Sequence, residues 1–163
     1  MTQEIAGSMM LVLMVLALAA AGWGWYRHIK RSSPLKAFLT FDVPDGEPTL
    51  SVRALYVATT KADDPIARVA AGPLAYRAKA SLSLFPEGVV VKLAGSDALL
   101  IPRESGLQAG LATWTIDRVV EPEGLLMLRW TLGDTPVDSY FRIVDGDVYQ
   151  VVRKISDLQE NTV

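Results

Sequence analysis

Carboxylate pairs are the first residues in this sequence that could do chemistry. Three pairs occur at short spacings: Asp63 with Asp64, Asp134 with Asp138, and Asp145 with Asp147. Paired carboxylates can carry out acid–base catalysis or bind hard cations. Each pair falls at an expected turn, where aspartate is favoured because it hydrogen-bonds to nearby backbone groups. A calcium loop that began at Asp145 would also have Ser156 where the loop needs a glutamate. We therefore predict turn and capping roles for these carboxylates.

The sequence lacks the residue combinations that nucleophilic catalysis and nucleotide binding require. The sequence has no cysteine, and His28 is its single histidine, so a thiol nucleophile, a disulfide and a thiolate metal site are excluded. No serine lies in a G-x-S-x-G motif, and no second histidine could serve as its base. Gly106 and Gly110 are not followed by the Lys-Ser/Thr of a phosphate-binding loop. We predict no catalytic residue, no cofactor and no metal ion.

Three basic residues remain as candidates for ligand or partner binding: Arg68, Arg77 and Lys79. A guanidinium group offers a planar fork of donors that fits phosphate or carboxylate. The structural alternative is that these cations pair with Asp63 or Asp64 and fix a loop. Residues 37–163 contain 12 basic and 17 acidic side chains, so the domain is net acidic. This charge disfavours nucleic acid and anionic lipid as partners and favours the structural role.

The elements that would position these residues begin with an apolar N-terminal helix. Residues 5–26 contain no charged side chain. At about 1.5 Å per residue they extend roughly 33 Å, and the hydrocarbon core of a bilayer is about 30 Å thick. The apolar residues surround the helix without leaving a polar stripe, unlike those of a soluble amphipathic helix. The sequence therefore predicts a transmembrane helix at 5–26.

The charges on either side of this helix predict its orientation. The preceding segment carries Glu4 and no lysine or arginine. A cleaved signal peptide would have its basic residues in front, so we expect a retained anchor. Because cytoplasmic flanks collect lysine and arginine, the N-terminus is expected outside the plasma membrane and the C-terminal domain in the cytoplasm. The expected membrane-interface residues are Trp23, Trp25, Tyr26, Arg27, Lys30 and Arg31.

The rest of the chain has a β pattern that ends in a helical pattern. Residues 27–48 are rich in proline, glycine and serine and are expected to form a juxtamembrane linker. From Thr49 onward, short runs rich in β-branched residues alternate with turn signals and predict about seven antiparallel strands. Residues 148–158 then repeat apolar side chains at helical spacing. This order is that of a pleckstrin-homology-like (PH-like) barrel or sandwich at 49–160, although other small barrels share the periodicity.

Motifs spread over the chain carry a resemblance to a known family. They are residues 55–60 (LYVATT), 68–82 (RVAAGPLAYRAKASL), 87–89 (EGV), 101–102 (IP) and 124–142 (GLLMLRWTLGDTPVDSYFR). With them the chain resembles actinobacterial membrane-anchored proteins that carry a PH-like domain, often labelled transporter, export or membrane protein. The resemblance implies a PH-like fold, an N-terminal membrane helix and genes that lie beside pyrimidine-biosynthesis genes. It implies no catalytic residue.

These observations predict a non-catalytic adaptor or accessory subunit. It would be a single-pass membrane protein whose PH-like domain binds a protein partner at the cytoplasmic membrane face. The anchor would raise the effective concentration of the domain near membrane-bound partners. The alternative is an inner-leaflet module that binds lipid head groups or small anions through Arg68 and Arg77. An enzyme would need a pocket with converging carboxylates, and an exported domain would need the opposite topology.

Overall fold

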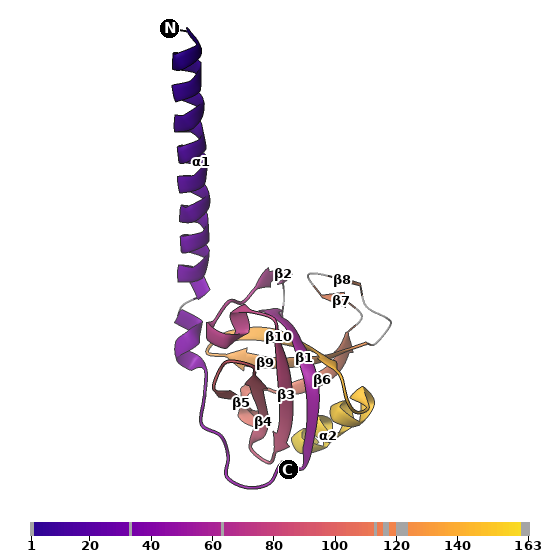
Figure 1. Cartoon of the computed structure of the whole chain (residues 1–163). Helices are drawn as coiled ribbons and strands as arrows, with labels where there is room; N and C mark the ends of the chain where they lie inside the picture. The colour runs from indigo at the N-terminus through magenta and orange to yellow at the C-terminus, as the bar shows by residue number, and fades with distance from the viewer. Residues whose placement is uncertain are drawn as a thin grey trace.

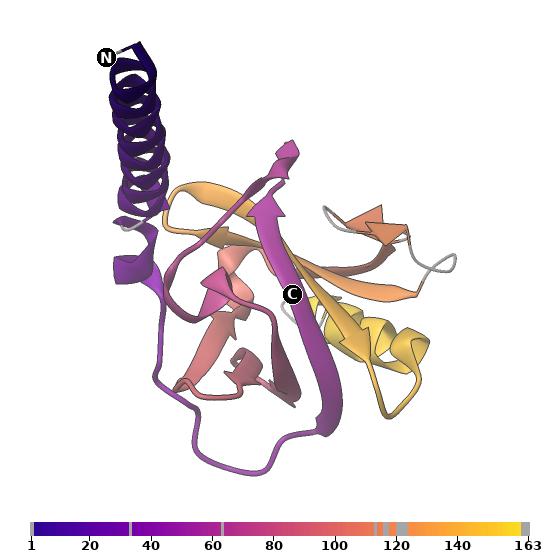
Figure 2. The same ribbon diagram turned by 45° about the horizontal axis from the view of Figure 1, so that its top comes forward.

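The computed structural model describes residues 2–32, 34–62, 64–112, 114–115, 118–119 and 124–160. A long N-terminal helix, α1 (Thr2–Ser32), extends away from a β domain that follows it in the chain (Figure 1). A short 3₁₀ helix, η1 (Pro34–Phe38), joins the two. The view in Figure 2 shows the same separation between α1 and the strands.

Helix α1 contains the predicted apolar helix and is longer than predicted. Its described apolar and aromatic side chains are exposed, with accessible fractions of 53–76% between Met9 and Tyr26. The described part of the chain contains no helix with both the length and the apolar character that crossing a membrane requires. The predicted membrane span at 5–26 is therefore not supported, whereas the helix itself is present.

The β domain is built on one antiparallel sheet of eight strands. Seven follow one another in space in the order β5-β4-β3-β1-β10-β9-β6, and β2 pairs with β1 beside them. The strands are β1 (Leu50–Lys61), β2 (Asp64–Arg68), β3 (Ala78–Phe85), β4 (Gly88–Leu93), β5 (Ala98–Pro102), β6 (Gln108–Ala112), β9 (Leu125–Leu132) and β10 (Thr135–Ile143). A separate hairpin consists of β7 (Trp114–Thr115) and β8 (Arg118–Val119). The prediction of a mainly antiparallel β domain is confirmed.

Strand β1 organises the sheet because it pairs with β3, β10 and β2. Its first half alternates buried and exposed residues, as expected for a strand with one face on the core and one in water. The register with β10 then shifts between Tyr56 and Ala58. Such a bulge rotates the strand locally. As a result Thr59 lies opposite Ser139, and both side chains are buried.

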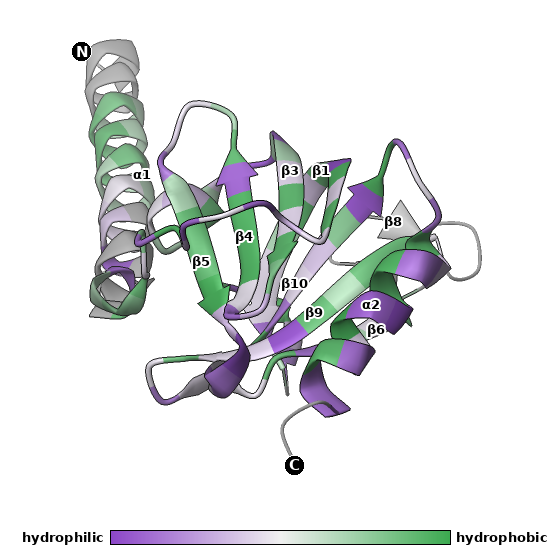
Figure 3. Ribbon diagram, turned by 90° about the horizontal axis from the view of Figure 1, so that it is seen from below, coloured by the Kyte–Doolittle hydropathy of each residue, from purple (hydrophilic) through white to green (hydrophobic). Residues whose placement is uncertain are grey.

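Helix α2 (Val148–Glu160) confirms the predicted C-terminal helix. The Asp147 carboxylate accepts a hydrogen bond from the Tyr149 N–H group at 2.9 Å, which is the expected N-cap contact. The helix contacts β6 and β9, and buries Val151 and Ile155 against the hydrophobic core. In Figure 3 hydrophobic residues run through β4, β5 and β9, while α2 alternates hydrophilic and hydrophobic residues as an amphipathic helix does.

Residues 38–40, at and just after the end of η1, pack on the β domain. The ring of Phe38, the last residue of η1, would lie 2.8 Å from a Cβ atom placed on Gly133, in the β9–β10 turn. The next residue, Leu39, is buried and lies close to Gly72 at the start of η2 (Gly72–Ala75). Thr40 then pairs with Leu100 of β5. Residues 38–40 thus belong to the packed domain; we call the region of η1, η2 and the β9–β10 turn the helix-proximal end.

We predict that Gly133→Ala loosens this attachment. The residue has a φ of +61°, and the added methyl group would also collide with the Phe38 ring. The left-handed backbone and the overpacking together should lower the free energy of unfolding by about 2–4 kcal/mol. Urea unfolding of the two proteins measures the difference.

Gly95→Ala is the matched control for backbone strain alone. Gly95 has a φ of +82° and open space around its Cβ position, so only about 1–2 kcal/mol should be lost there. Equal losses at the two glycines would contradict the proposed contact with Phe38. Adding Phe38→Ala to Gly133→Ala should recover part of the loss.

Candidate functional site

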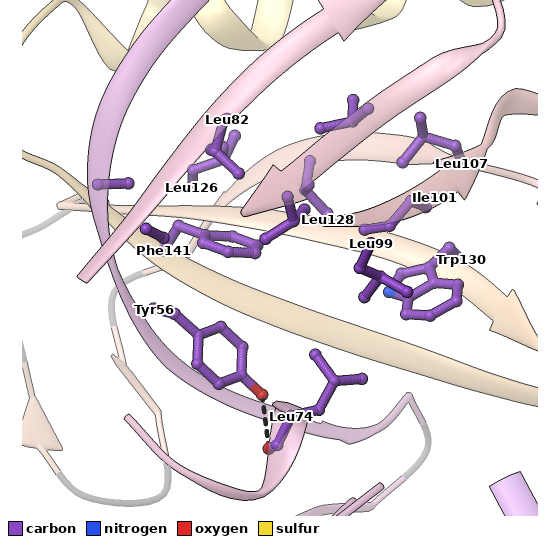
Figure 4. Packing of buried hydrophobic residues seen from close by; sticks show 14 of the residues in the cluster. Tyr56, Leu74, Leu82, Leu99, Ile101, Leu107, Leu126, Leu128, Trp130 and Phe141 are labelled. Atoms are coloured by element: carbon purple, nitrogen blue, oxygen red, sulfur yellow. Dashed lines mark hydrogen bonds between the residues drawn. The ribbon is translucent and has the colours of Figure 1, made fainter. Parts of the chain in front are cut away.

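A chain of buried hydrogen bonds fixes the interior of the β domain at the helix-proximal end. The Trp130 indole Nε1 lies 3.0 Å from Ser139 Oγ, which lies 2.8 Å from Thr59 Oγ1. Thr59 Oγ1 lies 2.9 Å from the Tyr56 hydroxyl, and this hydroxyl lies 2.9 Å from the carbonyl oxygen of Leu74 (Figure 4). The chain therefore links β9, β10, β1 and η2.

The chemistry of its two ends gives this chain a single direction. An indole N–H can only donate, and a carbonyl oxygen can only accept. The single proton of the Tyr56 hydroxyl goes to Leu74, so Thr59 donates to Tyr56, Ser139 to Thr59, and Trp130 to Ser139. Hydrogen bonds aligned in this way polarise and strengthen one another in a dry interior.

Burial also changes the acidity of the phenol in this chain. Loss of solvent raises the pKa of Tyr56 well above 10, an effect that the Thr59 hydrogen bond and the nearby Arg68 charge only partly oppose. The Tyr56 ring packs against Phe141 at a centroid distance of 5.5 Å. A neutral phenol is thus held as a donor at any physiological pH. We therefore assign Tyr56 a structural role in the hydrogen-bond chain.

Arg68, a candidate from the sequence, lies beside this chain rather than in solvent. Its side chain is half-buried, and its Nε atom is buried without a hydrogen-bond partner in the described residues. Asp64 Oδ1 accepts hydrogen bonds from the backbone N–H groups of Ile66 and Ala67, at 3.1 and 3.2 Å. Asp64 therefore has the turn role that aspartate favours.

A basic groove lies on the outer face of β1, β3 and β4. It has a volume of about 610 Å³ and is lined by Arg53, Lys79, Ser81, Lys92 and the turn 94–97, among other residues. The three cations are exposed. They come from three neighbouring strands, because alternate residues of each strand point to the same face.

Few carboxylates oppose these cations. Asp145 Oδ2 lies 2.7 Å from Arg53 Nε, in a pair whose side chains are 45% and 76% exposed, and such exposed pairs contribute only about 0–1 kcal/mol. Asp97 also lines the groove. Lys79 and Lys92 form no ion pair with any residue that the structure describes. The groove therefore carries net positive charge on a domain that is net acidic.

The three basic candidates do not form one cluster in this groove. Lys79 lines it, whereas Arg68 and Arg77 are absent from its lining. Arg77 is exposed one residue after Tyr76, which follows η2. Arg53 and Lys92 were not predicted from the sequence. Only the pairing of β1, β3 and β4 brings them beside Lys79, and residue spacing alone does not give that pairing.

The aromatic and basic residues predicted at a membrane interface lie along the last turns of α1. Trp23 and Tyr26 are 73% and 66% exposed, and Arg27 is exposed as well. The side chains of Trp25, Lys30 and Arg31 lie outside the described set. No group of three or more metal-ligating side chains occurs in the described residues.

The structure combines a curved antiparallel sheet, one C-terminal helix and a basic surface groove. Residues 35–156 match the family model described as bacterial PH domain-like. Because the match covers most of the chain, the protein belongs to this family, which confirms the predicted PH-like domain. A comparison with curated proteins finds no match.

We predict that Tyr56→Phe destabilises the domain by about 1–3 kcal/mol, because the Thr59 hydroxyl and the Leu74 carbonyl both lose a buried partner. The folded pKa of Tyr56 exceeds the value of 10.0 of a free phenol, so its contribution is fully present below pH 10 and falls as the pH rises further. Urea unfolding on both sides of pH 10 measures this effect. As the pH rises, the free energy of unfolding should fall less in Tyr56→Phe than in the parent protein.

Tyr76→Phe is the control, because the Tyr76 side chain is 71% exposed. It should leave the free energy of unfolding unchanged. A Tyr56→Phe protein as stable as the parent would show that the hydrogen-bond chain does not contribute to folding.

Proposed function

We propose that this protein is a non-catalytic binding module that α1 attaches to a membrane. The observation that carries the proposal is the apolar surface of α1. Its described side chains from Met9 to Leu18 are exposed, and none of them is charged. A continuous apolar surface of this kind is unfavourable in water, and the lipid of a membrane can remove it from water. The resemblance to membrane-anchored PH-like proteins supports the same attachment.

The charges beside α1 support a defined orientation. Basic residues follow the apolar stretch, whereas residues 1–4 carry none, and this asymmetry supports a β domain on the cytoplasmic side of the plasma membrane. The packing of Phe38 and Leu39 on the β domain supports a chain path that holds the end of η1 against the domain. One end of the domain therefore stays close to the bilayer.

The role that fits this arrangement is that of an adaptor or accessory subunit for a protein partner. The family supports a binding module, and the described surface offers the basic groove for a partner. Attachment to the membrane raises the local concentration of the domain for partners held in the same membrane. This role requires binding at the groove and no chemical reaction there.

Crosslinking in native membranes tests this proposal. A C-terminal tag on the full chain should recover one stoichiometric protein partner after mild crosslinking and gentle solubilisation. The chain should also stay in the membrane fraction after alkaline carbonate extraction. A chain that carbonate releases would contradict the attachment, and recovery of lipid alone would contradict the adaptor role.

A second candidate function is recognition of anionic lipid head groups at the helix-proximal end. It is favoured by exposed residues around that end: Tyr76 is 71% and Ile66 80% exposed, and Arg77 lies next to Tyr76. An aromatic or aliphatic side chain beside a cation suits a bilayer interface.

For this second function we expect Arg68→Ala/Arg77→Ala to abolish binding of residues 34–163 to vesicles that contain phosphatidylglycerol. Arg153→Ala/Lys154→Ala removes the same charge from exposed positions of α2 and should leave binding intact. Thermal unfolding checks the fold, and Arg77→Ala alone serves if the double variant unfolds. Unchanged binding in the arginine variants would reject head-group recognition there.

A further inference from the structure

The first row of the basic groove runs straight across three strands. Arg53 of β1 pairs with Ser81 of β3, and Ser81 pairs with Lys92 of β4. Adjacent strands are about 4.8 Å apart, so the two cations stand about 10 Å apart with a serine between them. This serine is half-buried, whereas both cations are exposed.

A second row lies two residues further along β1 and β3 and is shifted by one strand, so that it runs from β10 to β3. Arg142 of β10 pairs with Leu55 of β1, and Leu55 pairs with Lys79 of β3. Leu55 is 41% exposed, and both cations are exposed. Two residues along a strand correspond to about 7 Å, so the outer face presents four cations in two rows at that interval.

This interval is that of an extended peptide. In an extended chain, the side chains at positions i and i+2 point to the same side and are about 7 Å apart. Carboxylates at alternate positions can therefore reach both rows while the backbone lies over Ser81 and Leu55. A single phosphate group has no second anionic centre at this interval, so the two rows favour a protein segment over a lipid head group.

Asp145 already provides a model for such a contact. Its carboxylate lies on Arg53 Nε at 2.7 Å, and both side chains remain largely exposed. Because an exposed ion pair is weak, a carboxylate from outside can replace it with little loss of stability. Asp145 thus competes with any acidic partner for Arg53.

We propose that the two rows bind an extended acidic segment of a partner protein, with carboxylates at alternate positions. This inference rests on the proposed adaptor function and identifies the chemistry of its partner. The segment passes between Arg53 and Lys92 in the first row and between Arg142 and Lys79 in the second. The net acidic charge of the domain repels such a segment in general, and the cations of the two rows offset this repulsion locally.

A fluorescent peptide of about ten residues that alternates glutamate and threonine tests the proposal. Fluorescence anisotropy with the full chain in a neutral detergent should show saturable binding, which weakens as sodium chloride rises from about 0.05 M to about 0.5 M. A peptide of the same composition with its glutamates in one block should bind more weakly. A preference for the block peptide would contradict the two-row geometry.

Three variants locate the binding. Lys79→Gln/Lys92→Gln should weaken it about tenfold, because one cation is lost from each row. Arg153→Gln/Lys154→Gln removes the same charge from α2 and should leave it unchanged. Asp145→Asn should tighten peptide binding about threefold, because the Arg53 guanidinium no longer pairs with a carboxylate of its own chain. All five positions are exposed, and unchanged thermal unfolding confirms the fold.

The remaining outcomes either overturn the proposal or separate its failure from that of the proposed function. Equal weakening in the two double variants would show only a general charge effect. Absence of peptide binding, with or without binding to phosphatidylglycerol vesicles, would assign the groove to something other than an acidic segment. If the full chain captures a stoichiometric partner in native membranes but ignores the peptide, the adaptor function stands and the groove inference fails. If carbonate releases the chain while the peptide binds as expected, the attachment fails alone.

Discussion

The directed hydrogen-bond chain from Trp130 to the Leu74 carbonyl is the interaction on which the rest of the β domain depends. Its links lie on β9, β10, β1 and η2, so it holds together segments that hydrophobic contact alone could place in several ways. Each polar atom in it would be costly to bury alone. The β1 bulge between Tyr56 and Ala58 is the backbone change that brings Thr59 into the chain. At this end, buried hydrogen bonds therefore determine which arrangement the chain adopts, whereas burial of apolar side chains provides most of the stability.

Different surfaces of the domain have different roles. At one end, Phe38 of η1 and the next residue, Leu39, pack against the domain. Helix α2 covers the core beside β6 and β9 with Val151 and Ile155. The outer face of β1, β3 and β4 carries the exposed cations of the groove. Attachment and the proposed recognition therefore use separate residues, and a change at one surface need not alter the other.

The sequence predicts local elements of this fold better than its surfaces. The alternation from 80 to 85 and the helical repeat from 148 to 158 both report burial directly, so β3 and α2 follow from them. The β1 bulge leaves no periodic signal, because it is set by what Thr59 meets across the sheet. The basic groove is equally hidden: Arg53 and Lys92 are far from each other in sequence and meet only through strand register. The apolar run at 5–26 predicts a helix, but its surroundings are not a property of the chain alone.

The bridge between Thr40 and Leu100 has a consequence for how the chain can be divided. Strand β5 ends the sheet, and an unpaired edge offers backbone groups to which any other strand can add. The Thr40 carbonyl oxygen accepts the Leu100 N–H hydrogen bond at 2.8 Å and so covers the middle of that edge. A fragment that began at Thr49 would lack both Thr40 and Leu39. The unpaired backbone groups of β5 would then be open to strands of other molecules. Residues 39 and 40, between the helix and the first strand, thus shield part of this edge from other strands.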